Sequence, residues 1–296
     1  MSFALLQDIV DAAERENKPF WRIVLEENCR EQDMTCESAI DTMRQMYQAM
    51  RFADENYDST LRSASGMAGG DGEKLRVYRL HGGGLLGPYL NEVTEKAVKM
   101  AESNACMKRI VAAPTAGSCG VIPAVLLTYE SQRQMAEDRM VEALFTAAGI
   151  GTVIACNASI AGAEGGCQAE IGTASAMAAG ALVHLEGGTE EAICHGAALA
   201  LKSLLGLTCD PVAGLVEVPC IKRNASGAVN AVVAAQMALA GIRSAITPDE
   251  VIDSMRRIGK LLPSCLRETS QEGLAITPTA LKIAKNLRGT ALENGT

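Results

Sequence analysis

Three cysteines of this chain lie in short breaks between helical stretches, each beside glycine or proline. Cys167 follows two glycines, Cys209 precedes an Asp-Pro pair, and Cys220 follows a proline. A cysteine that only fills space in a core needs no such bend, whereas a metal ligand needs the backbone to aim its thiolate and to offer N–H groups to nearby sulfur. Zinc usually takes closely spaced cysteine pairs, which these three do not form. They are therefore candidates for a metal site, and ordinary packing stays open as the alternative.

Two glycine-rich stretches, residues 63–72 and 81–84, carry polar side chains suited to a ligand. Glycine at this density allows either mobility or a close approach of backbone to ligand. The candidates for a lid that binds substrate are Ser65, Gly66, Asp71 and Lys74. The alternative is a plain linker between an N-terminal bundle and the remainder.

Two further polar stretches lie close to helix starts. The turn made of Thr115, Ala116, Gly117 and Ser118 precedes an apolar helix. Because helix N-termini present free N–H groups, this turn is a candidate for binding a substrate carboxylate, with a simple capping turn as the alternative. The residues that follow Cys220 include Lys222, Arg223 and Asn224. One of these is expected to bind a carboxylate or support the sulfur atoms, unless they are solvated surface groups.

No general base can be assigned from the residue pattern. His184 and His195 lie in helical stretches, where a structural role is favoured. His81, in its glycine-rich loop, is the histidine that best suits a catalytic role.

Composition indicates a tightly packed helical protein. Of the 296 residues 48% are apolar, but only 3% are aromatic, and glycine, alanine and methionine are abundant. Small side chains let helices approach closely, and methionine fills irregular gaps.

The charge and the cysteines narrow the class of protein. The net charge is −8, and no run of lysine and arginine suits a phosphate backbone, so we expect no nucleic-acid partner. Apolar runs such as residues 171–185 fall short of a membrane span. Ten cysteines without a signal-peptide core at the N-terminus argue against a disulfide scaffold. We therefore expect a cytoplasmic protein that spans no membrane.

Apolar residues at helical spacing predict a mainly α fold. Helices are expected over residues 3–14, 37–52, 90–104, 121–132, 137–150, 171–185, 189–205 and 226–242. Thr247-Pro248 and Thr277-Pro278 are typical helix starts. Strand signals are limited to residues 108–112 and 215–218.

These elements predict a compact helical domain with buried Gly/Ala-rich helices and short irregular loops that carry the site. Residues 1–60 are expected to form an N-terminal helical segment that packs on the core. Residues 61–296 are expected to form the catalytic helical domain, continuous with that segment.

Four sequence segments resemble the α-subunit signatures of bacterial iron–sulfur L-serine dehydratases. They are residues 65–71, 114–120, 164–172 and 209–224, which occur in the same order as in that family. The likeness covers nearly the whole chain. It implies that Cys167, Cys209 and Cys220 ligate a 4Fe–4S cluster, and that Cys119, in the second segment, has a packing or substrate-facing role.

The resemblance also implies a reaction. Three ligands for four irons leave one iron free to act as a Lewis acid on the β-hydroxyl of L-serine. Loss of water would give aminoacrylate, which hydrolyses to pyruvate and ammonia in a step of amino-acid degradation that feeds gluconeogenesis. The cluster would transfer no electrons.

The chain departs from its longer relatives in one respect. Single-chain members of the family carry an additional regulatory-type domain with a Ser-Ser-His-Thr motif, which does not occur here. The resemblance thus implies a hetero-oligomer in which a separate β subunit supplies that part, and a lone chain that is incomplete.

Three other functions remain as alternatives. An L-cysteine desulfidase would use the same cluster to eliminate sulfide. A non-enzymatic iron–sulfur protein would need a fourth ligand and usually closely spaced cysteines. Pyridoxal-phosphate chemistry is disfavoured, because the glycine-rich loops do not follow strands.

Overall fold

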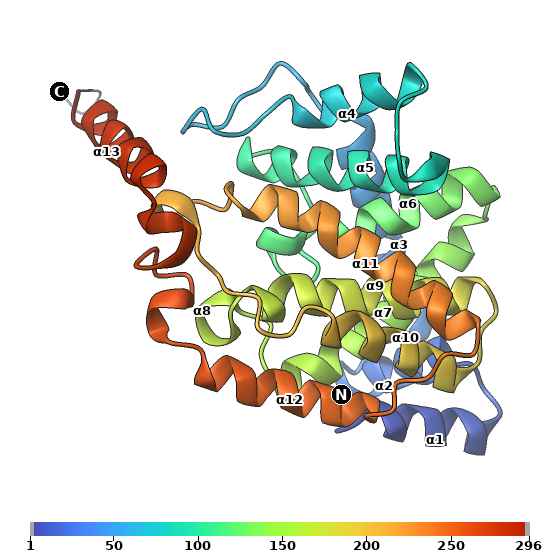
Figure 1. Ribbon diagram of the computed structural model, residues 1–296. Helices are drawn as coiled ribbons and strands as arrows, with labels where there is room; N and C mark the ends of the chain where they lie inside the picture. Colours follow the sequence, from blue (N-terminus) through green and yellow to red (C-terminus); the bar gives the residue numbers. More distant parts are fainter. Residues whose placement is uncertain (1–2, 294–296) are drawn as a thin grey trace.

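The computed structural model describes residues 3–293, with side chains up to residue 289. This part of the chain is built from α-helices and short turns and holds no β-strand, which confirms the predicted mainly α class (Figure 1). The helices are α1 (Leu6–Glu16), α2 (Phe20–Glu31), α3 (Cys36–Glu55), α4 (Asp71–Leu80), α5 (Gly87–Ala105), α6 (Val121–Arg133), α7 (Glu137–Asn157), α8 (Gly162–Gly165), α9 (Thr173–Leu185), α10 (Glu190–Lys202), α11 (Cys220–Leu239), α12 (Pro248–Leu261) and α13 (Pro278–Glu293).

Helix α9 is the centre of the fold, and every one of its residues is buried. It packs against α7, α10 and α11 (Figure 1). Its small residues permit this crowding: a β-carbon on Gly180 would lie 2.2 Å from Cδ1 of Ile150 in α7. The prediction of buried Gly/Ala-rich helices is therefore confirmed.

The N-terminal helices share the core of the remaining chain. Leu6, Phe20 and Tyr47, from α1, α2 and α3, are fully buried in the same hydrophobic cluster as Ile150 of α7. Helices α1, α2 and α3 thus share a hydrophobic core with the later helices. The outermost ends of the predicted ranges, residues 1–2 and 294–296, lie outside the described residues.

Helix α7 extends seven residues beyond the expected helix at residues 137–150, to Asn157. The helix is long and apolar enough to cross a membrane, but 67% of its apolar window is buried inside the protein. Burial on this scale is the mark of a core helix, and α7 packs against α2, α3 and α9.

Several predicted boundaries were wrong. Residues 108–112 and 215–218 form irregular chain and turns, because no neighbouring strand pairs with their backbone groups. Within residues 3–293 the one isolated β-bridge joins Cys209 to Arg267. Helix α11 begins six residues earlier than expected, at Cys220, and α2 and α4 were not predicted. By contrast, Thr247 and Thr277 precede α12 and α13, as their sequence predicted.

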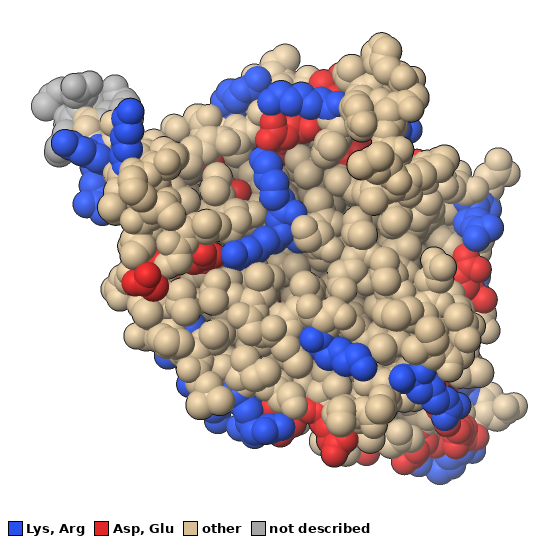
Figure 2. All heavy atoms as spheres, viewed as in Figure 1, with Lys and Arg blue, Asp and Glu red and all other residues tan. Residues whose placement is uncertain are grey.

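Helix α13 extends from the body of the molecule (Figure 1). Its recorded packing is against two short helical turns, Val212–Gly214 and Gly273–Ile276. On the face shown in Figure 2 most of the surface is uncharged, and acidic groups lie close to many of the basic ones.

Candidate active site

The three cysteines singled out from the sequence lie in one buried region. Cys167 precedes a short π-helical turn (Gln168–Gly172), Cys209 pairs with Arg267 in the isolated bridge, and Cys220 is the first residue of α11. Their exposed fractions are only 2%, 3% and 7%. Burial raises the pKa of Cys209, and the charges of Cys167 and Cys220 raise it further. Three separate loops thus bring three thiols close enough to influence one another.

A neighbouring glutamine holds the backbone around Cys167. The Gln168 side chain donates to the carbonyls of Gly165 and Met255, at 2.9 and 3.1 Å, and accepts from Gly206 N at 2.9 Å. Its own backbone N–H donates to Leu207 O at 3.0 Å. The side chain therefore fixes the turn after Cys167 to the loop that leads to Cys209.

An arginine and an aspartate hold the loop at Cys209. Arg223 donates to Thr208 O at 2.7 Å and to Oδ1 of Asp210 at 2.8 Å, and the Oδ2 of Asp210 accepts from Leu274 N at 2.9 Å. The guanidinium also lies beside Cys167, where it opposes the rise in that thiol's pKa that burial causes. Arg223 thus holds the loop at Cys209 and lies beside the Cys167 thiol.

Asn224 joins the start of α11 to the turn at residues 115–120. Its Nδ2 donates to Gly117 O at 2.8 Å and to Cys220 O at 3.0 Å, and its Oδ1 accepts from Gly120 N at 2.8 Å. The side chain is 1% exposed, so every polar atom of this buried amide is used within the protein. Asn224 therefore positions Cys220 and the turn.

We expect Asn224→Ala to lower the free energy of unfolding. The change leaves the buried Gly120 N without its partner, at about 1–3 kcal/mol, and also removes the partner of the partly buried Gly117 O. Urea unfolding followed by circular dichroism measures the loss. The control is Ser226→Ala on the same helix, at an exposed position. Equal stability of the two variants would contradict the role assigned to Asn224.

The glycine-rich loop at residues 63–72 is tied down by two buried glutamates. The Glu102 carboxylate accepts from the backbone N–H groups of Gly69, Asp71 and Gly72 at 2.9–3.2 Å. Glu217 accepts from the hydroxyls of Ser63 and Ser65, at 2.7 and 2.6 Å. Since Glu217 lies three residues before Cys220, the loop is anchored beside the cysteine region.

The other predicted lid residues reach the same place. Asp71 pairs with Lys222 at 2.6 Å and with Lys74 at 2.8 Å, and all three side chains are at least partly exposed. His81 is different, because it ends α4, about 15 Å along the helix from Asp71. Its exposed ring contacts Val77 O at 2.8 Å. The structure therefore joins Asp71 and Lys74 to Lys222 near the start of α11, ties Ser65 to Glu217, and leaves His81 apart.

The other two histidines also lie away from the cysteines along their elements. His184 is near the end of α9, where burial lowers its pKa to about 4. His195 in α10 accepts from Ser244 N at 3.3 Å. Since the sequence has three histidines, all described, none of them is placed as a base beside the thiols.

The metal-binding capacity of the region follows from the thiols. Burial raises the pKa of Cys167 to about 11 and that of Cys220 to about 12, so in the metal-free chain both are protonated at neutral pH. Binding of a metal group must release these protons. Within residues 3–293 no three His, Cys, Asp or Glu side chains converge tightly enough to hold a single ion. A four-iron cluster is larger than a single ion, so the thiolates that bind it lie further apart than the ligands of one ion.

Cys119 belongs to a different environment. It is fully buried beside Met100 and Ala53, and its Sγ lies 3.9 Å from Met100 O. Burial raises its pKa to about 12. Packing, one of the two roles considered for it, accounts for this position.

Glu170 is a functional candidate that the sequence analysis did not single out. Its Oε1 accepts from the Thr115 hydroxyl at 2.7 Å. A β-carbon on Gly162 would lie 2.8 Å from its Oε2 and 3.0 Å from Sγ of Cys209. Burial raises its pKa, although the hydrogen bond from Thr115 acts against the rise. The sequence did carry a signal for Glu170. This acid stands three residues after the candidate ligand Cys167, in a break between helices.

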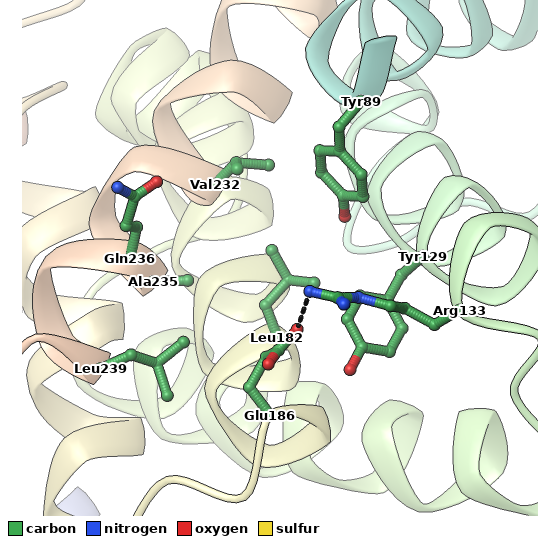
Figure 3. A pocket seen from close by; sticks show the side chains of 9 residues that line it. All are labelled: Tyr89, Tyr129, Arg133, Leu182, Glu186, Val232, Ala235, Gln236 and Leu239. Carbon is green, nitrogen blue, oxygen red and sulfur yellow. Dashed lines mark hydrogen bonds and ion pairs between the residues drawn. The ribbon is translucent and has the colours of Figure 1, made fainter. Parts of the chain in front are cut away.

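The pocket shown in Figure 3 is a separate feature of about 280 Å³. Tyr89 and Tyr129 line it together with apolar side chains of α9 and α11, and the Arg133–Glu186 ion pair, at 3.1 Å, borders it. It contains none of the residues selected from the sequence.

The family assignment agrees with this arrangement. Residues 15–275 match the family model described as the serine dehydratase alpha chain. The chain belongs to this family. The match includes all three cysteine loops, the turn at residues 115–118 and the glycine-rich loop.

Two alpha-chain relatives are similar over most of their length, and a longer relative is similar over part of its length. The probable L-serine dehydratase alpha chain of Bacillus subtilis (strain 168) is 48% identical over 266 residues, which cover 89% of each chain. The L-serine dehydratase alpha chain of Peptoniphilus asaccharolyticus is 38% identical over 281 residues, or 95% of this chain and 96% of that one. The L-serine dehydratase TdcG of Escherichia coli (strain K12) is 49% identical over 182 residues, which cover 61% of this chain and 40% of TdcG.

Proposed function

We propose that this chain is the alpha subunit of an L-serine dehydratase that converts L-serine to pyruvate and ammonia. The observation that carries the proposal is that three buried thiols from three segments lie in one region. The chain that holds them belongs to the serine dehydratase alpha chain family. The names of the relatives supply the substrate.

We further propose that Cys167, Cys209 and Cys220 hold a 4Fe–4S cluster. The donor set supports this: three thiols, an arginine beside one of them, and no tight cluster of ligands for a single ion in the described chain. When bound, a cluster with one iron free of protein thiolate supplies a Lewis acid for departure of the hydroxyl group.

The chain's own residues would hold and orient the reactants. Gln168, Arg223 and Asn224 fix the three cysteine loops, so the thiols are preorganised rather than gathered by the metal. The turn from Thr115 to Ser118 remains our candidate for the substrate carboxylate. Two contacts tie the glycine-rich loop and α4 to the chain around Cys220. Ser65 hydrogen-bonds to Glu217, and Asp71 pairs with Lys222.

We also propose that a separate β subunit completes the enzyme. TdcG has more than half of its length outside the aligned region, whereas the alpha-chain relatives are matched over nearly all of theirs. No histidine of this chain is placed beside the thiols, so the β subunit is the expected source of a catalytic base.

A substrate comparison tests the activity. The chain, reconstituted with iron and sulfide under argon and mixed with its β subunit, is given L-serine or L-cysteine at equal concentration. We expect pyruvate from L-serine at the higher kcat/KM. Faster release of sulfide from L-cysteine would instead identify a desulfidase, and no turnover of either would favour a non-enzymatic protein.

A further inference from the structure

We propose that Glu170 binds the α-ammonium group of the substrate and thereby selects amino acids over hydroxy acids. The inference rests on the proposed function and assigns a substrate contact that the family match does not supply. It comes from the position of one carboxylate among the three cysteine loops.

Two segments converge on this carboxylate, the turn at residues 115–118 and the chain at Gly162. Thr115 donates to Oε1 at 2.7 Å, and a β-carbon on Gly117 would lie only 2.9 Å from the same oxygen. On the other side, a β-carbon on Gly162 would lie 2.8 Å from Oε2. Glycine at both positions therefore leaves the space that the carboxylate occupies.

Glu170 also lies among the thiols. Its Oε2 and Sγ of Cys209 flank the same point beside Gly162, at 2.8 and 3.0 Å. Its charge acts on Cys167, Cys209 and Cys220 alike. A small substrate that reaches the thiols must therefore come close to this carboxylate.

The carboxylate has spare capacity for a cation. Within the described residues no lysine, arginine or histidine pairs with Glu170, and its hydrogen-bond donor is Thr115. Other interior acids are satisfied: Glu95 pairs with Arg79, and Glu102 accepts from three backbone N–H groups. The like charge of Glu268 also acts on Glu170, which makes the region still more attractive to a cation.

The shape of an amino acid fits this place. Its ammonium and carboxylate groups are bonded to the same carbon, so the protein groups that bind them must be neighbours. Glu170 is in contact with Thr115 and lies against Gly117, two residues of the turn that we propose for the carboxylate. A charge-assisted hydrogen bond to the ammonium would complete the pair.

Binding of two matched ligands tests the proposal. L-alanine and propanoate differ only in the α-ammonium group, and neither has a leaving group. Each is titrated calorimetrically into the reconstituted enzyme with its β subunit, as wild type, Glu170→Gln and Glu164→Gln. Glu164 is the control because it lies six residues earlier, in α8, with an exposed side chain.

We expect Glu170→Gln to weaken L-alanine binding roughly 10- to 100-fold and to leave propanoate within about two-fold, since only the charged contact is lost. Glu164→Gln should change neither. An equal loss for both ligands, unchanged L-alanine binding, or loss of the cluster absorbance in Glu170→Gln would overturn the proposal, the last by making Glu170 a cluster ligand. Failure of the wild type to form pyruvate from L-serine would reject the proposed function separately.

Discussion

Replacing Cys167, Cys209 or Cys220 by alanine is expected to abolish both cluster binding and pyruvate formation. Each variant removes one of the three thiolates proposed to hold the cluster. Because changing residues that merely support metal ligands costs about 10- to 100-fold, losing a ligand should cost more than about 100-fold in activity. The measurements are iron content, absorbance at roughly 400 nm, where thiolate–iron charge transfer falls, and pyruvate release.

Two cysteines serve as controls for these variants. Cys156 is exposed at the end of α7, and Cys119 is fully buried beside Met100. Cys156→Ala and Cys119→Ala should keep the cluster and the activity. If Cys119→Ala lost the cluster while remaining folded, Cys119 would have to replace one of the three proposed ligands.

The alpha chain alone, with its cluster restored, is expected to release little pyruvate. Asp71 is paired with both Lys74 and Lys222, His81, His184 and His195 lie elsewhere, and Glu170 is assigned to the substrate ammonium group, so no histidine is placed as a base beside the thiols. General-base catalysis typically contributes about 100- to 10,000-fold, so adding the β subunit should raise turnover by at least the lower of these factors.

Titrating the β subunit into a fixed amount of alpha chain measures this dependence. An equal amount of serum albumin is the control for non-specific stabilisation. Pyruvate release should rise with β subunit and level off at a fixed ratio. Full turnover by the lone alpha chain would show that its base lies within this sequence.

The helices with a single apolar stripe or a strong cap could be predicted from the sequence. Helix α12, opened by Thr247, is such a case. Helix α2 was missed because its apolar residues face two clusters: Phe20 and Ile23 pack into the main core, while Leu25 packs in a second one. Helix α4 was missed because it buries only Gly72 and is held by the hydrogen bonds of its N-terminus to Glu102.

The candidate site could be predicted in part for similar reasons. The three cysteines stand in loops with glycine or proline, which is a local signal. Other contacts of the site join residues far apart in the chain, so no local pattern reveals them. Asn224 contacts Gly117 and Gly120, and Glu170 contacts Thr115. Helix α11 begins at Cys220 through such contacts, without a Ser or Thr cap.

Iron dependence is the most direct test of the central claim, that three thiols hold a catalytic cluster. Alpha and β subunits are assayed for pyruvate from L-serine in three samples: reconstituted under argon, the same sample after exposure to air, and a sample depleted of iron by a chelator. The account predicts activity that follows iron content and the roughly 400 nm absorbance, and that is lost in the second and third samples. Full activity in the iron-free sample would mean that Cys167, Cys209 and Cys220 are packing residues and that the proposed cofactor is wrong.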